Sequence, residues 1–264
     1  MSLRRLYVPA ERLAGARVVL VDDDHQHVAR VLRARAGDRL TLFDGVGGEV
    51  DAEVTHVGKR DTELALGARR AGVATAAPFA ITLLVAVPRG ERLDLVVQKT
   101  TELGVARVVP VLTDRSVARP EPARRARWEK IAREAARQCG RADVPRVDAP
   151  VALATAVADP ELPQARFALW EAERGRSLRA RLAAAPPGPA ALLIGPEGGF
   201  PATEVAAAEA AGFVPVSLGP RVLRVETAAI VAVALAQAAA GGLDEVPADP
   251  LNLPASHTVP KMGA

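Results

Sequence analysis

The chain has 264 residues, a size that favours two domains over one. Hydrophobic residues make up 49% and charged residues 25%, and no apolar run approaches the ~18 residues that cross a bilayer. The N-terminal segment lacks an apolar stretch behind its arginines, so we expect neither a signal peptide nor a membrane partner. The single cysteine, Cys139, excludes an intramolecular disulfide and a multi-cysteine zinc site, and favours a cytoplasmic location.

The net charge of +3 does not by itself indicate a nucleic-acid partner. All but four of the 34 basic residues are arginine, which suits phosphates and base edges, although a GC-rich genome would give the same bias. Nine basic residues against four acidic ones fall between Arg119 and Arg146. This segment is either a surface for RNA backbone or a solvated helix face.

The first 70 or so residues predict a small β-barrel. Strands are expected at 18–21, 39–43 and 49–57. A glycine-rich turn at 44–48 joins two of them. A short helix between the first two strands is expected to place Val28, Val31 and Leu32 on one side.

From residue 79 onward the pattern changes to strands that alternate with helices, which is typical of a mostly parallel α/β sheet. Strands are expected at 81–87, 105–112, 167–170, 190–194 and 214–218. Helices are expected from Leu93 to a stop at Gly104, and at 123–139, 178–185, 203–211 and 227–240. We predict domains at 1–72 and 78–243, with a small-residue linker at 71–78 and a loose tail at 244–264.

The strongest motif is 192–200, where an apolar strand enters the turn Gly195-Pro196-Glu197-Gly198-Gly199. Ligands of open α/β sheets bind at the carboxyl ends of strands, and glycines let them approach the backbone. The turn is neither a P-loop nor a dinucleotide-binding fingerprint, and an ordinary turn would also use these glycines.

A second glycine loop follows the strand that ends at Leu218 and leads into an apolar helix. Glu226 falls at the start of that helix, where its charge complements the helix dipole. Arg221 and Arg224 are spaced to lie near the mouth of a pocket between the two loops, although Arg224 and Glu226 would also suit a purely structural ion pair.

Other chemistries find no support in the sequence. The four histidines show no metal-ligand spacing apart from His25 and His27, which favour a polar helix start, so we expect no metal site. A hydrolase nucleophile elbow is absent. Cys139 has no base beside it. Eight aromatic residues give no obvious base-stacking platform, and their pattern favours core positions for Tyr7, Trp128 and Trp170.

Seven segments in matching order resemble the ribosomal RNA small subunit methyltransferase E family, the 16S rRNA (uracil-N3) methyltransferases of the SPOUT superfamily. The resemblance extends from Arg5 to Leu243. The segments are RLYVP at 5–9, HVARVLR at 27–33, FDG at 43–45, QKTTELGV at 98–105, EAARQCGR at 134–141, and the two glycine loops.

The resemblance implies a PUA-like barrel that engages RNA and a SPOUT α/β domain with a deep trefoil knot. It implies S-adenosylmethionine as cofactor and a homodimer, whose interface would cover the apolar last helix. Its substrate would be 16S rRNA or the small ribosomal subunit. The implied cofactor-binding residues are Leu169, Trp170, Ile194, Gly195, Pro196, Glu197, Gly198, Gly199, Leu218, Gly219, Arg221, Val222 and Leu223.

The candidate RNA surface comprises the basic helix and the matching positions of the first domain. Its residues are Arg5, Tyr7, His27, Arg30, Arg33, Arg124, Arg137 and Arg141. For catalysis, we expect Arg224, with Arg221 as a second candidate beside it, to stabilise charge on the uracil oxygens. Glu197 or Glu226 would accept the N3 proton or hold the arginine. Two other functions remain open, namely methylation of another RNA position such as a ribose 2′-hydroxyl, and a non-catalytic RNA-binding assembly factor.

Overall fold

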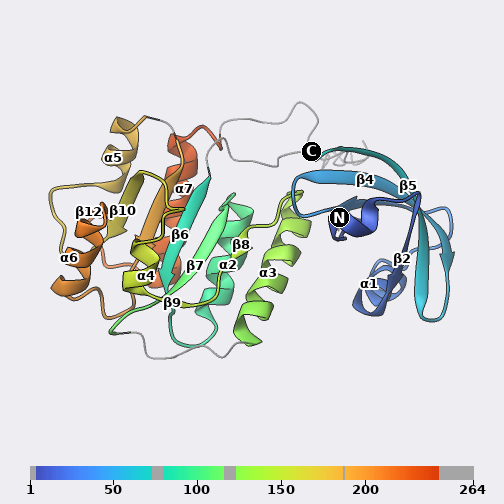
Figure 1. The fold of residues 1–264 in the computed structure, drawn as a ribbon, viewed down its shortest axis with the longest axis horizontal. Coiled ribbons are helices and arrows are strands. Elements are labelled where there is room, and N and C mark those ends of the chain that lie inside the picture. Colours follow the sequence, from blue (N-terminus) through green and yellow to red (C-terminus); the bar gives the residue numbers. More distant parts are fainter. Residues whose placement is uncertain (1–3, 73–79, 116–122, 187, 244–264) are drawn as a thin grey trace, which may run out of the picture.

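The computed structural model describes residues 4–72, 80–115, 123–186 and 188–243. Figure 1 shows two lobes side by side, each built on its own sheet. The proposed boundaries 1–72 and 78–243 each enclose one sheet, whereas most of the expected linker and the tail 244–264 lie outside the described residues. No helix in the described part of the chain is long and apolar enough to span a membrane.

The first lobe is a five-stranded sheet in the order β1-β3-β4-β5-β2. Its strands are β1 (Arg5–Tyr7), β2 (Arg17–Val21), β3 (Arg39–Phe43), β4 (Gly48–Val57) and β5 (Asp61–Ala71), and a 3₁₀ turn, η1 (Ala10–Leu13), follows β1. The three strands expected from the sequence are present, and β1 and β5 are additional. Alternate side chains of β2 and β4 are buried, which explains why their two-residue pattern marked them as strands.

The helix of the first lobe differs from the expected one. An α-helical segment, α1 (Asp22–Gln26), continues into a π-helical segment, η2 (His27–Val31), in which the Leu32 amide donates to the His27 carbonyl at 2.9 Å. A π-turn is wider than an α-turn, so side chains rotate out of the phase that an α-helix would give. Val28 is buried as expected, but Val31 is 68% exposed, so the prediction that they share one face was wrong.

The second lobe is a parallel sheet whose main path is β12-β10-β11-β6-β7-β8, with β9 also pairing to β7. Its strands are β6 (Ile81–Ala86), β7 (Arg107–Leu112), β8 (Arg146–Val147), β9 (Val151–Ala152), β10 (Ala165–Leu169), β11 (Ala190–Ile194) and β12 (Val214–Val216). All six residues of β6 and all five of β11 are buried, as expected for strands covered on both faces.

Helices cover both faces of this sheet. They are α2 (Arg92–Glu102), α3 (Ala123–Cys139), α4 (Leu153–Val157), α5 (Leu178–Ala184), α6 (Ala202–Ala210) and α7 (Val225–Ala239). Side chains of α2, α3, α5 and α7 share one buried cluster with Leu192 and Ile194, whereas α4 and α6 pack with Leu193 on the opposite face. The five expected helices are present, and α4, β8 and β9 were not anticipated because they are too short for a periodic pattern.

A buried junction connects the lobes. The tip of the β3–β4 turn pairs with the segment after α3, where the Val144 amide donates to the Gly45 carbonyl at 2.9 Å. Arg5, from β1, donates to Glu49 at 2.5 Å and to the carbonyl of Arg141 at 3.0 Å. The Arg5 and Glu49 side chains are only 7% and 1% exposed. The lobes are therefore held together by a desolvated polar network as well as by apolar contact.

Candidate functional site

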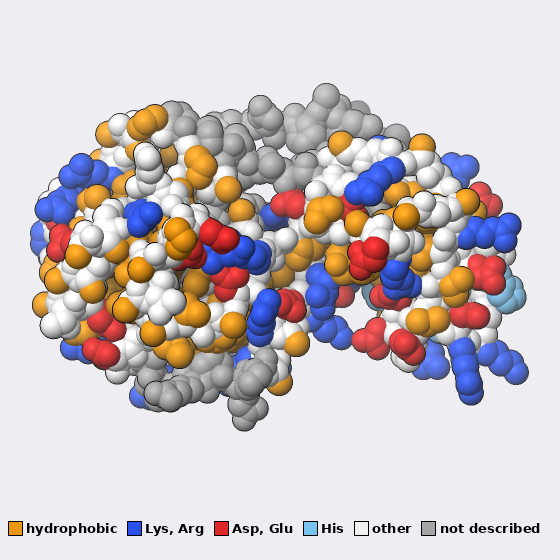
Figure 2. All heavy atoms as spheres, viewed as in Figure 1, with side chains coloured by type: hydrophobic (Ala, Val, Ile, Leu, Met, Phe, Trp, Pro, Cys, Tyr) orange, Lys and Arg blue, Asp and Glu red, His pale blue; other side chains and the backbone are white. Residues whose placement is uncertain are grey.

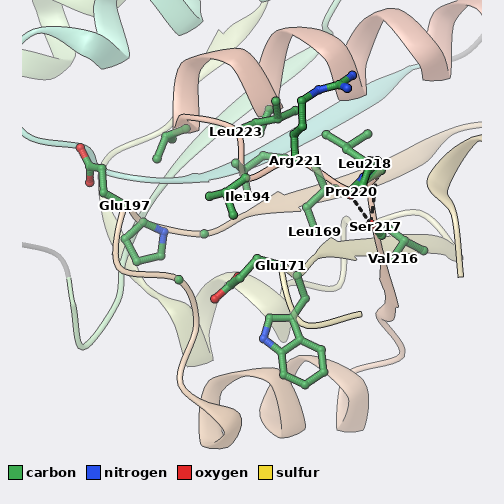
Figure 3. Close-up of a pocket in the computed structure, with 18 of the residues that line it drawn as sticks. Leu169, Glu171, Ile194, Glu197, Val216, Ser217, Leu218, Pro220, Arg221 and Leu223 are labelled. Carbon is green, nitrogen blue, oxygen red and sulfur yellow. Dashed lines mark hydrogen bonds between the residues drawn. The ribbon is translucent and has the colours of Figure 1, made fainter. Parts of the chain in front are cut away.

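The candidate site lies where three neighbouring parallel strands end. Leu169 of β10 is in register with Ile194 of β11 and with Val216 of β12, so the loops after the three strands emerge together. They enclose a cavity of about 260 Å³, which we call the strand-end pocket (Figure 3). In Figure 3, Leu169 and Ile194 lie at its centre, between Glu197 on one side and Leu218 on the other.

All thirteen residues expected to bind a cofactor line the strand-end pocket. Sequence reasoning missed five other lining residues, which are Arg174, Val216, Ser217, Val225 and Ala228, and Glu171 and Pro220 complete the lining. Ser217 shapes the β12 loop, because its hydroxyl accepts from the Gly219 amide and donates to the Gly219 carbonyl, both at 3.1 Å. A serine two residues before a glycine is a weak turn signal that would have marked this position.

The glycines of the β11 loop are required by space and by conformation. Gly199 has φ +69°, and a Cβ atom placed on it would collide with Glu171 Oε1. A Cβ on Gly195 would lie 3.0 Å from the Phe200 ring. An ordinary turn would explain the positive φ of Gly199, but it would not explain these close approaches. Without Cβ atoms, the backbone of the loop forms a thin wall of the pocket.

Glu171 gives the pocket an available hydrogen-bond acceptor. It lies opposite Ile194 in Figure 3, and no hydrogen bond or ion pair to its carboxylate occurs within the described residues. An ionised carboxylate accepts hydrogen bonds only, so this position suits hydroxyl or ammonium donors of a bound molecule. Around it, Leu169, Ile194 and Val216 provide an apolar floor.

Glu197 lines the pocket, but its carboxylate is already engaged. Oε1 accepts from the Arg92 guanidinium at 2.8 Å and from the Arg89 amide at 3.3 Å. In Figure 3 the carboxylate lies at the outer end of the site, away from Leu169. The contacts with Arg92 and Arg89 hold this carboxylate at the outer end of the site. This geometry favours a positioning role for Glu197 over the proton-accepting role.

Arg224 and Glu226 lie beside the pocket and not in its lining. Arg224 is the exposed N-cap residue of α7, between the lining residues Leu223 and Val225. Glu226 is half-buried in the first turn, and its Oε2 atom is buried without a hydrogen-bond partner in the described part of the chain. No ion pair joins Arg224 to Glu226 among the described residues, so the purely structural pairing is not observed.

The expected RNA surface needs correction, because five of its eight residues lie at the junction between the lobes. Arg5 and Arg141 are each only 6% exposed. Arg141 donates to the carbonyls of Thr101 and Val105 at 2.7 and 3.0 Å and pairs with Asp143. A buried guanidinium with these partners cannot reach a phosphate. The remaining junction residues are Tyr7, His27 and Arg137.

One face of α3 contacts the first lobe through basic side chains at helical spacing. Lys130 lies 3.4 Å from Asp23, Arg133 stacks 5.7 Å from the centre of the Tyr7 ring, and Arg137 donates to His27 at 3.0 Å. Figure 2 shows basic and acidic side chains intermixed around the notch between the lobes. Much of the basic segment therefore joins the lobes. Of the expected RNA residues, Arg30 and Arg33 are exposed and Arg124 is half-buried.

His27 makes the junction sensitive to acid. Burial, and next the Arg137 guanidinium, lower the pKa of His27 from its usual value, whereas Glu134 and Asp24 act in the opposite direction. The unfolded chain therefore binds this proton more readily than the folded one. The contribution of neutral His27 to the stability of the fold is complete above pH ~6.5, the usual pKa of histidine. It is lost as the pH falls through the lower pKa that His27 has in the folded protein.

We expect His27→Gln, which keeps an acceptor but does not titrate, to lessen the loss of Tm between about pH 8 and about pH 5.5. The measurement is the Tm of wild type and variant across that range. His56→Gln replaces an exposed histidine of β4 and is the matched control. Parallel Tm profiles for wild type and His27→Gln would contradict this role for His27.

Comparison with known proteins identifies two matching family models. Residues 75–237 match an RNA methyltransferase domain and residues 20–64 match an RNA methyltransferase PUA domain. The chain is 32% identical over 232 residues to the ribosomal RNA small subunit methyltransferase E of Synechocystis sp., covering 87% of this chain and 76% of that protein.

Two solved structures are similar over nearly the whole described chain. A methyltransferase from Legionella pneumophila in complex with SAM is 36% identical, with a TM-score of 0.81 and coverage of 90% of this chain and 98% of that one. The Neisseria gonorrhoeae ribosomal RNA small subunit methyltransferase E bound to S-adenosyl methionine is 32% identical, with a TM-score of 0.80 and coverage of 89% and 97%. With the two lobes and the strand-end pocket, these matches establish that the chain belongs to the ribosomal RNA small subunit methyltransferase E family of RNA methyltransferases.

Proposed function

We propose that this protein transfers a methyl group from S-adenosylmethionine to N3 of a uridine in 16S rRNA of the small ribosomal subunit. The observation that carries the proposal is the convergence of the loops after β10, β11 and β12 on one cavity. Similar chains with SAM bound, and relatives named for ribosomal RNA methylation, support the cofactor and the substrate class.

The lining of the strand-end pocket fits this cofactor. The apolar floor suits the adenine ring, and the glycine backbone of the β11 loop permits close approach. The unpaired Glu171 carboxylate suits ribose hydroxyls or the ammonium group. S-adenosylmethionine supplies an already activated sulfonium methyl, so the main task of the protein is to align the acceptor.

The acceptor also has to lose a proton, because N3 of uracil is protonated at neutral pH and faces inward in a base pair. We assign stabilisation of the developing charge on the uracil oxygens to Arg224, with Arg221 as a second candidate beside it. The Arg224 guanidinium has no hydrogen-bonding or ion-pair partner within the described residues and so is available to substrate. Glu226 is the better candidate for the proton acceptor, because Glu197 is held by Arg92.

Arg224→Ala should lower kcat by about a hundredfold, the loss typical of removing one donor that stabilises transition-state charge. Donor affinity should change little, because Arg224 is not among the lining residues. Single-turnover methylation gives the rate, and calorimetric titration with S-adenosylmethionine gives the affinity. Equal losses in both would make Arg224 a cofactor-binding residue instead.

The proposal includes a homodimer, a deep trefoil knot and a cytoplasmic location. A partner covering α7 would account for its apolar side chains that stay partly exposed in one chain, which are Ile230, Val231, Ala234 and Leu235. The knot would pass the chain end around the loops of the strand-end pocket. The domain division at 1–72 and 78–243 and the separate tail at 244–264 are part of the same proposal.

The function is tested in two steps. Calorimetric titration should detect S-adenosylmethionine binding, and small-subunit RNA incubated with protein and donor should yield 3-methyluridine on nucleoside mass spectrometry. A 2′-O-methylated nucleoside would show the alternative RNA methyltransferase. RNA binding without donor binding or methylation would show the non-catalytic assembly factor, and either result would overturn the proposed reaction.

A further inference from the structure

A group of arginines borders the β11 loop on the side away from the strand-end pocket. In the sheet, β11 is followed by β6 and then β7, so the loops after β6 and β7 lie beside the β11 loop. Arg92 donates to Glu197 at 2.8 Å, and Arg115, just after β7, donates to the Gly198 carbonyl. Arg124 reaches the same region from α3, donating to the Gly90 carbonyl at 3.4 Å.

Arg89 is the member of this group whose side chain is unengaged. It lies between β6 and α2 and is exposed, and its backbone amide is 3.3 Å from Glu197 Oε1. Within the described residues its guanidinium makes no hydrogen bond or ion pair. Its backbone is therefore tied to the β11 loop while its charge remains available. We call Arg89, Arg92, Arg115 and Arg124 the loop-edge arginines.

Nearby acidic groups offset the charge of this set only in part, and of these Asp114 and Glu204 lie beside Arg115. Glu197 is shared between Arg92 and the Arg89 amide. Glu91 and Asp94 pair instead with Arg127, a residue outside the set. An excess of positive charge on exposed guanidinium groups favours an anionic ligand, and arginine binds phosphate through paired N–H donors.

Two anions could bind the loop-edge arginines, namely the carboxylate of S-adenosylmethionine and a phosphate of the RNA backbone. The position of these arginines favours the phosphate. The carboxylate of S-adenosylmethionine would lie within the strand-end pocket, whose lining contains Arg174 and Arg221 but none of the loop-edge arginines. The loop-edge arginines lie on the β6 and β7 side of the β11 loop, where an RNA strand can pass. Given the proposed function, we infer that the loop-edge arginines bind a backbone phosphate of the substrate RNA and position its target nucleotide beside the methyl donor.

The test compares Arg89→Ala, Arg89→Lys and the matched control Arg179→Ala, which removes an exposed arginine from α5. The probe is small-subunit RNA, with its Kd measured across a salt series, and calorimetry measures S-adenosylmethionine affinity in parallel. Arg89→Ala should weaken RNA binding about tenfold and reduce the salt slope by about one phosphate contact. Arg89→Lys should keep the slope, and Arg179→Ala should match wild type.

Donor affinity should be unchanged in Arg89→Ala. The inference is overturned if RNA affinity and salt slope of this variant equal those of wild type, or if its donor affinity falls while RNA binding stays intact. In both cases wild-type methylation of RNA would leave the proposed function standing. If wild-type protein binds neither donor nor RNA, the proposed function fails and the inference fails with it.

Discussion

Glu49→Ala is expected to lower the free energy of unfolding by roughly 3–5 kcal/mol. The Glu49 carboxylate is 1% exposed and accepts from Arg5 at 2.5 Å and from Arg70 at 2.9 Å. Its removal leaves the Arg5 charge buried, with the Arg141 carbonyl as its remaining hydrogen-bonding partner among the described residues. Denaturant unfolding of wild type and variant measures the change.

Glu53→Ala is the matched control, because Glu53 lies on the same strand with an exposed side chain. It should change stability by no more than about 0.5 kcal/mol. The double replacement Arg5→Met with Glu49→Leu should recover much of the loss, since no buried charge is then left without its partner. An equally small effect from Glu49→Ala and Glu53→Ala would contradict the importance of the buried junction.

Gly199→Val should weaken S-adenosylmethionine binding by about tenfold to a hundredfold. A β-branched residue at φ +69° imposes strain of roughly 1–3 kcal/mol, and its Cβ would collide with the Glu171 carboxylate. Either the β11 loop moves or the Glu171 carboxylate leaves its position, and both Gly199 and Glu171 line the cavity. Calorimetric titration at matched protein concentrations measures the loss.

Gly212→Val separates this effect from backbone strain alone. Gly212 has φ +86° after α6, a Cβ atom placed on it would meet no atom within 4 Å, and the residue is outside the pocket lining. The control should lose stability but keep donor affinity, whereas Gly199→Val should lose both. Retention of full donor affinity by Gly199→Val would show that the β11 loop does not form the cofactor site.

Much of the fold is predictable from local pattern. The apolar run of β11 and the long helix α3 have the bounds expected from the sequence, because continuous burial and regular spacing are visible in the chain itself. The glycine loops were located for the same reason, since each follows such a strand. The π-turn at His27–Val31 was not foreseeable, because its hydrogen bonding follows from packing and not from residue type.

The roles of individual arginines were the least predictable feature. Arg141 and Arg89 are both arginines of the second lobe, yet the first is buried among carbonyls and the second is exposed with an unengaged guanidinium in the described structure. The guanidinium of Arg5 shows the reason, because its acceptors on Glu49 and Arg141 lie 44 and 136 positions away in the chain. Sequence spacing does not predict such contacts. Only the packing of segments that are distant in the chain separates the structural arginines from those that remain open to a ligand.

The desolvated network around Arg5 and Glu49 also affects how the molecule meets its substrate. Separating the two lobes would break the hydrogen bond from the buried Arg5 side chain to the Arg141 carbonyl, as well as the backbone pairing of Val144 with Gly45, so the junction resists hinge motion. The span from Arg30 and Arg33 on the first lobe to the strand-end pocket on the second is then nearly constant. The protein therefore presents its substrate with two sites at a fixed distance. An RNA that contacts both has to bend to match that distance.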